Sequence, residues 1–211
     1  MKKIQLPYFT KTLGIEIDEK NLKGILENKA HEFQPNLSQE QIVKESLSNP
    51  IGTDCLSEIS KGKKNVLVIT SDHTRGVPSK ITLPLLLAEI RDGNPDANIT
   101  IIIATGLHRA TTEEEQRKMF GDDIVDNEKI LVHDAFDDSQ MKYVCQLPSG
   151  ASFVINKVAL ESDLIVCEGF IEPHFFAGFS GGRKSILPGI CSAETVNENH
   201  SSKAVGHCKS R

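Results

Sequence analysis

The stretch Asn65-Val66-Leu67-Val68-Ile69-Thr70 decides the fold, because it is a continuous apolar run of strand length. Such a run is typical of a strand that is buried on both faces of a parallel sheet. A second run, Ile99-Thr100-Ile101-Ile102-Ile103-Ala104, is rich in β-branched residues, which also favours a buried strand. Between the two runs we predict a helix that ends at Asp92-Gly93-Asn94-Pro95. Strand, helix and strand together make a βαβ unit.

The predicted helix carries two neighbouring apolar stripes. Its first stripe is Ile81, Leu85 and Leu86, and beside it lie Leu83, Leu87 and Ile90. Pro84 has no backbone N–H to donate, so it must lie in the first turn or kink the helix. The sequence therefore leaves the start of this helix open.

The alternation of helix and strand continues toward the C-terminus. A capping box, formed by Thr111 with Glu114 or by Thr112 with Glu115, predicts a short helix that ends near Gly121. Residues 129–133 and 163–167 are further apolar runs of strand length. These elements predict an open, mostly parallel, Rossmann-like α/β sheet with helices on both faces.

Residues 1 to about 50 differ from this pattern. They mix short strand-like pieces with a helix that we expect Ser38 and Gln41 to cap. We find no internal repeat or low-complexity linker, so we predict one domain over residues 1–211 that begins with a small mixed segment.

Composition limits the partners of the chain. It has 211 residues, of which 25% are charged and 38% hydrophobic, as in an ordinary globular protein. The net charge of -5 comes without a basic block, which argues against nucleic acid or an anionic membrane and favours a small-molecule partner. No apolar run approaches the roughly 20 residues that span a bilayer, and residues 1–8 lack the apolar core of a signal peptide. We therefore expect a cytoplasmic location.

The five cysteines form no C-x-x-C pair. An odd number that is spread along the chain does not resemble a disulfide framework, so we predict reduced thiols. Cys145 and Cys167 lie in apolar, strand-like runs, and we interpret both as small buried hydrophobes.

Polar residues follow three of the predicted strands. The first strand continues into Ser71-Asp72-His73-Thr74-Arg75, the second into Thr105-Gly106-Leu107-His108-Arg109, and the last into residues 168–174. In open α/β sheets the ligand lies outside the carboxyl ends of the strands, so Asp72, Arg75, His108 and His174 should converge there. Taken singly, each has another interpretation as a turn residue, a surface charge, a helix cap or a solvated loop histidine.

A glycine-rich segment follows, Gly178-Phe179-Ser180-Gly181-Gly182-Arg183-Lys184-Ser185. It is not a Walker A loop, because Arg183 stands where the second glycine belongs. A tight turn is one interpretation, and contact with an anion or nucleotide is the other, because backbone N–H groups of such segments can surround a phosphate. The predicted cofactor contacts are Gly178, Ser180, Gly181, Gly182 and Arg183. Lys184 is then free to bond covalently to a cofactor.

His200 is a further candidate. A histidine near the end of a helix is usually only solvated, but an imidazole nitrogen is also the commonest ligand for a transition metal in proteins. The segment from His174 to His200 is thus predicted to be the centre that holds a cofactor.

The motifs Asp72-His73-Thr74-Arg75, Ala104-Thr105-Gly106-Leu107-His108-Arg109 and Pro173-His174-Phe175-Phe176-Ala177-Gly178-Phe179-Ser180-Gly181-Gly182-Arg183-Lys184 closely resemble those of the nickel-pincer-nucleotide lactate racemase family. The three motifs occur in the order of the family, and the resemblance covers nearly the whole chain. Two departures are visible. Gly76 stands where the family commonly has proline, and family members carry a second, C-terminal domain that this chain lacks, so we expect the chain to be the N-terminal domain or a fragment.

The resemblance implies a cofactor, a nickel-pincer nucleotide (pyridinium-3,5-bisthiocarboxylic acid mononucleotide nickel). Lys184 stands at the position of the lysine to which this group is covalently attached. His200 matches the histidine that ligates nickel. The partners implied are therefore the enzymes that synthesise the cofactor and a small 2-hydroxy acid.

The resemblance also implies the reaction, racemisation of a 2-hydroxy acid through the 2-keto acid by hydride transfer. His108 and His174 match a pair of acid/base histidines, one for each enantiomer, whose pKa must lie near neutrality. Asp72 and Arg75 match polar residues of the active site, and the Arg75 guanidinium is suited to hold the substrate carboxylate.

Lactate is the expected substrate, with malate or another 2-hydroxy acid as the nearest alternative. A non-catalytic module that binds a nucleotide or a metal is a second interpretation. A zinc hydrolase is a third, but the sequence lacks H-E-x-x-H and any compact set of ligands.

Overall fold

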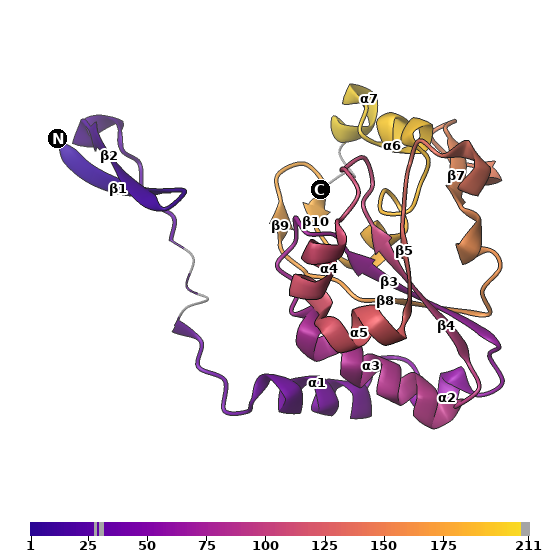
Figure 1. The fold of residues 1–211 in the computed structure, drawn as a ribbon. Coiled ribbons are helices and arrows are strands. Elements are labelled where there is room, and N and C mark those ends of the chain that lie inside the picture. The colour runs from indigo at the N-terminus through magenta and orange to yellow at the C-terminus, as the bar shows by residue number, and fades with distance from the viewer. Residues whose placement is uncertain (28, 30–31, 208–211) are drawn as a thin grey trace. The chain divides into compact units, whose positions relative to one another are not determined.

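The computed structural model describes residues 1–27, 29 and 32–207, which belong to two compact units, Met1–Ser38 and Gln39–Arg211 (Figure 1). The first unit is an antiparallel hairpin followed by a short 3-10 helix, with the bounds β1 (Lys2–Tyr8), β2 (Lys11–Ile17) and η1 (Glu19–Asn21). Residues that pair across an antiparallel ladder share a face, so Ile4 with Ile15 and Leu6 with Leu13 make one face of the hairpin apolar. The prediction of one domain over residues 1–211 stays a prediction.

The second unit contains the predicted sheet. Four parallel strands pair in the order β5-β4-β3-β8, with the bounds β3 (Asn65–Ser71), β4 (Asn98–Ala104), β5 (Lys129–Val132) and β8 (Leu164–Cys167). The central positions of β3 and β4 are buried on both faces, as continuous apolar runs require. All four predicted strands are confirmed.

One face of the sheet packs against helices. The helices that precede β5 are α1 (Gln39–Ser48), α2 (Leu56–Ser60), α3 (Ser79–Gly93), α4 (Glu113–Phe120) and α5 (Asp122–Asn127). Their buried side chains meet Val66, Val68 and Ile101 of the sheet in one core cluster. Of the two predicted capping boxes, the structure forms the one between Thr112 and Glu115, at the start of α4.

Helix α3 answers two questions that the sequence left open. Its core face is the stripe Leu83, Leu87 and Ile90, each at most 1% exposed, whereas the other predicted stripe is only partly buried. Pro84 lies inside the helix and not in its first turn, on the solvent side, where the loss of one backbone hydrogen bond is tolerated. Among the described residues no helix is both long and apolar enough to cross a membrane.

The other face of the sheet is covered by smaller elements. They are β6 (Met141–Gln146), β7 (Ser152–Asn156), η3 (Asp138–Gln140), η4 (Lys157–Ala159), α6 (Ala193–Asn199) and α7 (Ser202–Val205). A second core cluster joins Leu67, Ile69 and Ile102 of the sheet to Ile155 of β7 and Val196 of α6. The sheet is thus covered on both faces, which is the predicted α/β architecture.

The cysteine prediction is half right. Cys55, Cys145, Cys167 and Cys191 are free thiols, whereas Cys208 lies outside the described residues. The burial predicted for Cys145 and Cys167 is wrong, because both are exposed. Cys145 lies on a hairpin strand that faces solvent, and Cys167 ends the edge strand β8. Among the four described cysteines, Cys191 is the buried one, and burial raises its pKa to about 12.

Candidate active site

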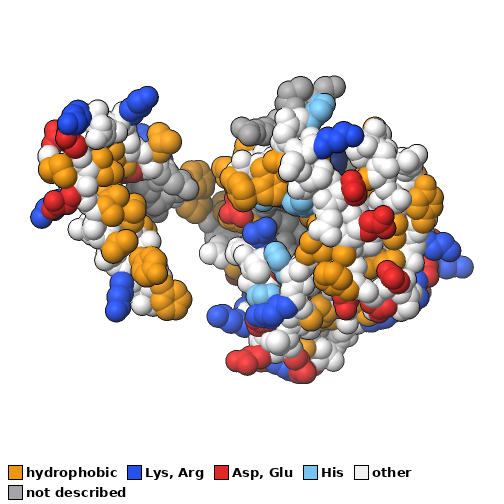
Figure 2. Space-filling model, turned by 90° about the horizontal axis from the view of Figure 1, so that it is seen from above, with side chains coloured by type: hydrophobic (Ala, Val, Ile, Leu, Met, Phe, Trp, Pro, Cys, Tyr) orange, Lys and Arg blue, Asp and Glu red, His pale blue; other side chains and the backbone are white. Residues whose placement is uncertain are grey.

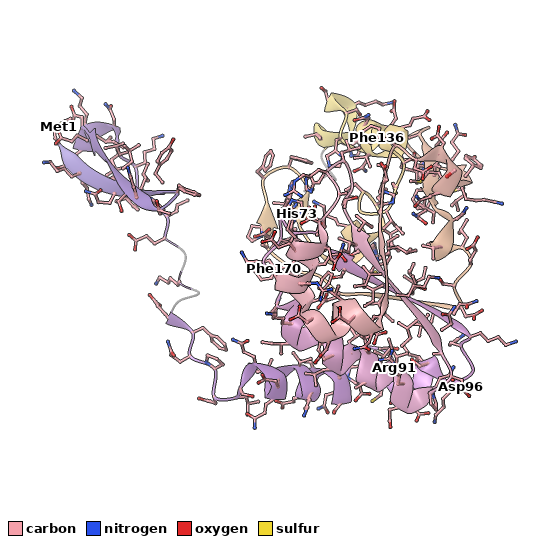
Figure 3. The ribbon with its side chains drawn as sticks, in the orientation of Figure 1. Met1, His73, Arg91, Asp96, Phe136 and Phe170 are labelled. Atoms are coloured by element: carbon pink, nitrogen blue, oxygen red, sulfur yellow. The ribbon has the colours of Figure 1, made fainter. Side chains whose placement is uncertain are left out.

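The order of strands in the sheet reverses at one place. From β3 the chain adds β4 and β5 on one side, and it then returns to place β8 on the other side of β3. Open α/β sheets bind ligands at such a reversal, outside the carboxyl ends of the strands. His73, which follows β3, and Asp96, which precedes β4, lie at opposite ends of the sheet (Figure 3). The segments after β3, β4 and β8 are therefore where a ligand is expected.

A cavity of about 390 Å³ lies at this edge. Eight of the predicted site residues line it, namely Asp72, Arg75, His108, His174, Ser180, Gly181, Lys184 and His200. Seen from above, histidine, lysine and arginine side chains gather on this face of the unit (Figure 2). The structure thus brings together side chains from three strand ends, as the sequence predicted.

Asp72 holds His108. The Asp72 side chain is 2% exposed, and its Oδ2 lies 2.6 Å from Nδ1 of His108. Its other oxygen, Oδ1, accepts hydrogen bonds from the backbone N–H and the hydroxyl of Thr74, at 3.1 and 2.6 Å. A carboxylate with these partners fixes the direction of the imidazole, whose side chain remains 49% exposed toward the cavity.

His174 is held in a different way. It belongs to a hairpin of two short strands, β9 (Pro173–His174) and β10 (Gly178–Phe179). Its Nδ1 accepts from the backbone N–H groups of Phe176 and Ala177, at 3.5 and 3.3 Å. The rings of Phe175 and Phe176 pack on the imidazole with centroids 5.0 and 4.5 Å away. Burial lowers the pKa of His174, and the charges of Lys184 and Arg75 act in the same direction.

Lys184 lies in the 3-10 helix η5 (Gly182–Ser185) and lines the cavity. Its backbone N–H donates to the Gly181 carbonyl at 3.1 Å, and its carbonyl accepts from Gly189 at 3.0 Å. Burial lowers the pKa of the Lys184 ammonium, and repulsion from Arg75 adds to this. A lysine that is easier to deprotonate is a better nucleophile, which suits covalent attachment of a ligand.

His200 follows α6 and is oriented by its own helix. Its Nδ1 lies 2.9 Å from the carbonyl of Val196, to which it can donate. The Phe176 ring packs edge-on against the imidazole with centroids 5.3 Å apart. Ligating histidines usually donate one ring N–H to a carbonyl in this way, so that the other nitrogen, here Nε2, is free for a metal.

The predicted glycine-rich contacts divide into two groups. Ser180 and Gly181 line the cavity. Gly181 has φ of +75°, and a Cβ there would lie 3.1 Å from the carbonyl oxygen of Phe170, so only glycine fits. Gly178, Gly182 and Arg183 are not among the lining residues, and Arg183 is exposed.

Glu168 is a buried residue whose importance the sequence analysis missed. It follows β8 and is 6% exposed. Its carboxylate accepts hydrogen bonds from the hydroxyls of Thr70, at 2.5 Å, of Ser79, at 2.9 Å, and of Thr82. It thereby ties the end of β3 and the start of α3 to the segment that leads to His174. Its only sequence signal was its place after a strand.

His133 is a second missed residue, at the end of β5. It is 1% exposed, and its Nε2 lies 3.0 Å from the carbonyl of Cys191. Its own carbonyl accepts from the hydroxyl of Thr105, a cavity residue, at 2.6 Å. Burial lowers the pKa of His133. The His133 imidazole therefore links the end of β5 to the backbone at Cys191.

The donor set fits a cofactor that brings most of its own metal ligands. Within residues 1–27, 29 and 32–207 no group of three or more His, Cys, Asp or Glu side chains could hold a metal ion. His200 lines the same cavity as Lys184, whose pKa is lowered, and the Nδ1 contact with Val196 leaves its Nε2 free for a metal. A metal held mainly by a lysine-bound group, with one histidine added, matches this arrangement.

Comparison with known proteins gives the family. The sequence profile of the lactate racemase N-terminal domain matches residues 8–211. The chain belongs to the lactate racemase family. It is 53% identical over 205 residues to a lactate racemase of Thermoanaerobacterium thermosaccharolyticum and 51% identical over 211 residues to one of Lactiplantibacillus plantarum. These alignments cover 97% and 100% of this chain, but 48% and 50% of the relatives.

The solved structures agree. The lactate racemase apoprotein from Thermoanaerobacterium thermosaccharolyticum superposes with a TM-score of 0.88 at 50% identity, over 100% of this chain and 49% of that one. A protein from Thermotoga maritima superposes with a TM-score of 0.65 at 28% identity, over 77% of this chain and 40% of its own length. The chain therefore spans about half the length of the lactate racemases that it matches.

Proposed function

We propose that the full-length protein racemises a small 2-hydroxy acid, with lactate as the first candidate. One observation carries the proposal: two histidines, a lysine of lowered pKa and a third histidine with a free nitrogen line one cavity. Two relatives that are named lactate racemase, at 53% and 51% sequence identity, support it. Malate would use the same carboxylate and hydroxyl, and it is the second substrate to test.

The cofactor in this proposal is a nickel-pincer nucleotide. Lys184 would hold it covalently, and His200 would ligate its nickel through Nε2. When bound, the group supplies an acceptor, and later a donor, for the hydride of the substrate C2 carbon. Ser180 and Gly181 line the cavity beside Lys184 and would contact the nucleotide.

The remaining side chains act on the substrate. Arg75 lines the cavity and can bind the substrate carboxylate through two N–H groups. His108 and His174 would exchange protons with the substrate hydroxyl, and each would serve one enantiomer. Positioned acid/base groups of this kind contribute about 10²–10⁴-fold to a rate. The expected location of the enzyme is the cytoplasm.

Mass spectrometry tests the cofactor role. The full-length protein, made together with the cofactor-synthesis enzymes, should carry an adduct of nucleotide size on Lys184 and nearly one nickel per chain. Lys184→Arg should remove both. Lys64→Arg is the matched control, because Lys64 precedes β3 at the other end of the sheet. An unmodified Lys184 in racemising protein would exclude covalent attachment.

Two variants test the acid/base role. His108→Ala and His174→Ala should each lower racemisation of lactate by about a hundredfold or more, since each removes a positioned acid/base group. The adduct on Lys184 should remain in both variants. Normal racemisation by either variant would show that this histidine is not needed.

A further inference from the structure

The two acid/base histidines are held through the same ring atom by opposite kinds of partner. Nδ1 of His108 faces a carboxylate oxygen of Asp72, and Nδ1 of His174 faces two backbone N–H groups. A carboxylate accepts hydrogen bonds and a backbone N–H donates them. The state of the proton on each ring therefore follows from its neighbours.

His108 must carry its proton on Nδ1. Asp72 is buried, and its Oδ1 already accepts two hydrogen bonds from Thr74, so the side chain acts as an acceptor toward His108 as well. The Nδ1–H of His108 donates to Oδ2 across 2.6 Å. In the neutral ring Nε2 then has a free lone pair, which is the form that takes a proton.

His174 must carry its proton on Nε2. The N–H groups of Phe176 and Ala177 both point at Nδ1, which has to be an acceptor. The stacked Phe175 ring and the edge-on Phe176 ring oppose rotation of the imidazole. In the neutral ring Nε2–H is then a donor, which is the form that gives a hydrogen bond.

We infer that His108 and His174 are held in opposite neutral tautomers, with His108 as the proton acceptor and His174 as the hydrogen-bond donor of the resting cavity. Asp72 is the positioning residue that sets the first, and the turn at Phe176 and Ala177 sets the second. What these tautomers mean for the reaction rests on the proposed function. For the enantiomer whose hydroxyl faces His108, the proton passes from the substrate oxygen to Nε2 of His108, and Asp72 balances the imidazolium charge.

Nitrogen NMR of the apoprotein tests the tautomers directly. The protein is labelled with ¹⁵N only at histidine, and long-range ¹H–¹⁵N correlations at neutral to mildly alkaline pH distinguish protonated from bare ring nitrogens. The signals are assigned with His108→Gln and His174→Gln. We expect protonated Nδ1 in His108 and protonated Nε2 in His174. The same tautomer in both rings would overturn the inference.

The chain supplies its own references for this experiment. His200 should match His108, because its Nδ1 faces the carbonyl of Val196. His133 should match His174, because its Nε2 faces the carbonyl of Cys191. Since no cofactor or substrate is present, this result stands apart from any failure of the racemase proposal.

Asp72→Asn tests what sets the tautomer of His108. We expect the His108 signals to lose the pattern of a pure Nδ1–H tautomer, while His133, His174 and His200 keep theirs. Asp96→Asn, at the other end of the sheet, is the matched control and should change none of them (Figure 3). An unchanged His108 in Asp72→Asn would remove Asp72 from its positioning role.

The loaded enzyme provides a second readout. Asp72→Asn should lower kcat/KM by about a hundredfold, since the base it orients contributes about 10²–10⁴. Two enantiomers have equal free energies in water, so kcat/KM must fall by the same factor in both directions. A normal kcat/KM in Asp72→Asn would contradict the assignment of His108 as the oriented base.

Discussion

The two histidine-bearing walls of the cavity are built differently. The sheet wall, residues 71–75 and 104–108, follows directly from β3 and β4, whose central side chains are completely buried. The hairpin wall, residues 173–179, consists of two strands of two residues each. Its Phe175 and Phe179 are 87% and 63% exposed. One wall is an extension of the core, and the other stands outside it.

This difference teaches how each histidine gains its orientation. In the sheet wall the buried side chain of Asp72 orients His108. Burial of such a polar group is tolerated only because the core holds its hydrogen-bond partners in place. In the hairpin wall the orientation comes from local backbone N–H groups and ring contacts, which need little support from the core. Substitutions in the core should therefore lower the stability of the fold strongly, whereas substitutions in the hairpin wall should leave it nearly unchanged.

The largest effect is expected from the core beneath the sheet wall. Ile102→Ala should lower the free energy of unfolding by about 4 kcal/mol, because a fully buried isoleucine is replaced by a partial void. Urea unfolding followed by circular dichroism measures this. Ile171→Ala, at a position that is 74% exposed, is the control and should have little effect. Equal losses in the two variants would contradict the distinction between core and surface.

The next effect is expected where the two walls are joined. Glu168→Gln should cost about 2 kcal/mol of unfolding free energy, because three hydroxyl groups lose a charged acceptor in a buried place. Glu161→Gln, at an exposed position, should leave urea unfolding unchanged. If Glu168→Gln is as stable as the unmodified protein, the carboxylate does not hold the walls together.

A smaller effect concerns pH. Burial lowers the pKa of His133 below its ordinary value of 6.5. Between this lowered pKa and 6.5, the unfolded chain therefore binds more protons than the folded chain. Stability should therefore fall as the pH drops below about 6.5, and it should recover as the pH rises. His174 has a lowered pKa as well, but it is less buried. Unfolding measured at several pH values should show a flatter profile in His133→Gln than in His174→Gln, and the reverse order would contradict this.

The smallest effect is expected on the hairpin wall. Phe175→Ala should change the free energy of unfolding by less than about 0.5 kcal/mol, because the ring is mostly exposed. The tautomer of His174 is the property to follow, since the ring of Phe175 stacks on it. A thermal unfolding midpoint far below that of the unmodified protein would mean that the hairpin wall is part of the core.

Much of the sheet could be predicted because its signals are local. The apolar runs of β3 and β4 are continuous, and the Thr112 to Glu115 capping box lies within four residues. The core face of α3 could not be chosen, because its two stripes are equally apolar and only the packing against the sheet decides between them. Cys145 was assigned to the core for a similar reason, since an apolar run does not tell which sheet it joins.

The sequence indicated which residues meet at the candidate site, but not which of them contact one another. The convergence of Asp72, His108 and His174 follows from their places after parallel strands. The bond between Asp72 and His108 spans 36 positions and depends on the register of β3 with β4, which no local pattern encodes. Glu168 went unnoticed because a lone carboxylate after a strand gives no sign of three hydroxyl partners.

The reversal of strand order has a consequence for how the protein folds. The contact between Asn65 and Asn98, at the start of β3 and β4, spans 33 positions, whereas the bond from Thr70 to Glu168 spans 98. Long loops close at a greater entropic cost, and nonlocal pairings slow folding. We therefore expect β8 to join the sheet after β4 and β5. Since His174, Lys184 and His200 all follow β8 in the chain, a partly folded molecule has no assembled cavity. The proposed cofactor could therefore attach only after the last strand has joined the sheet.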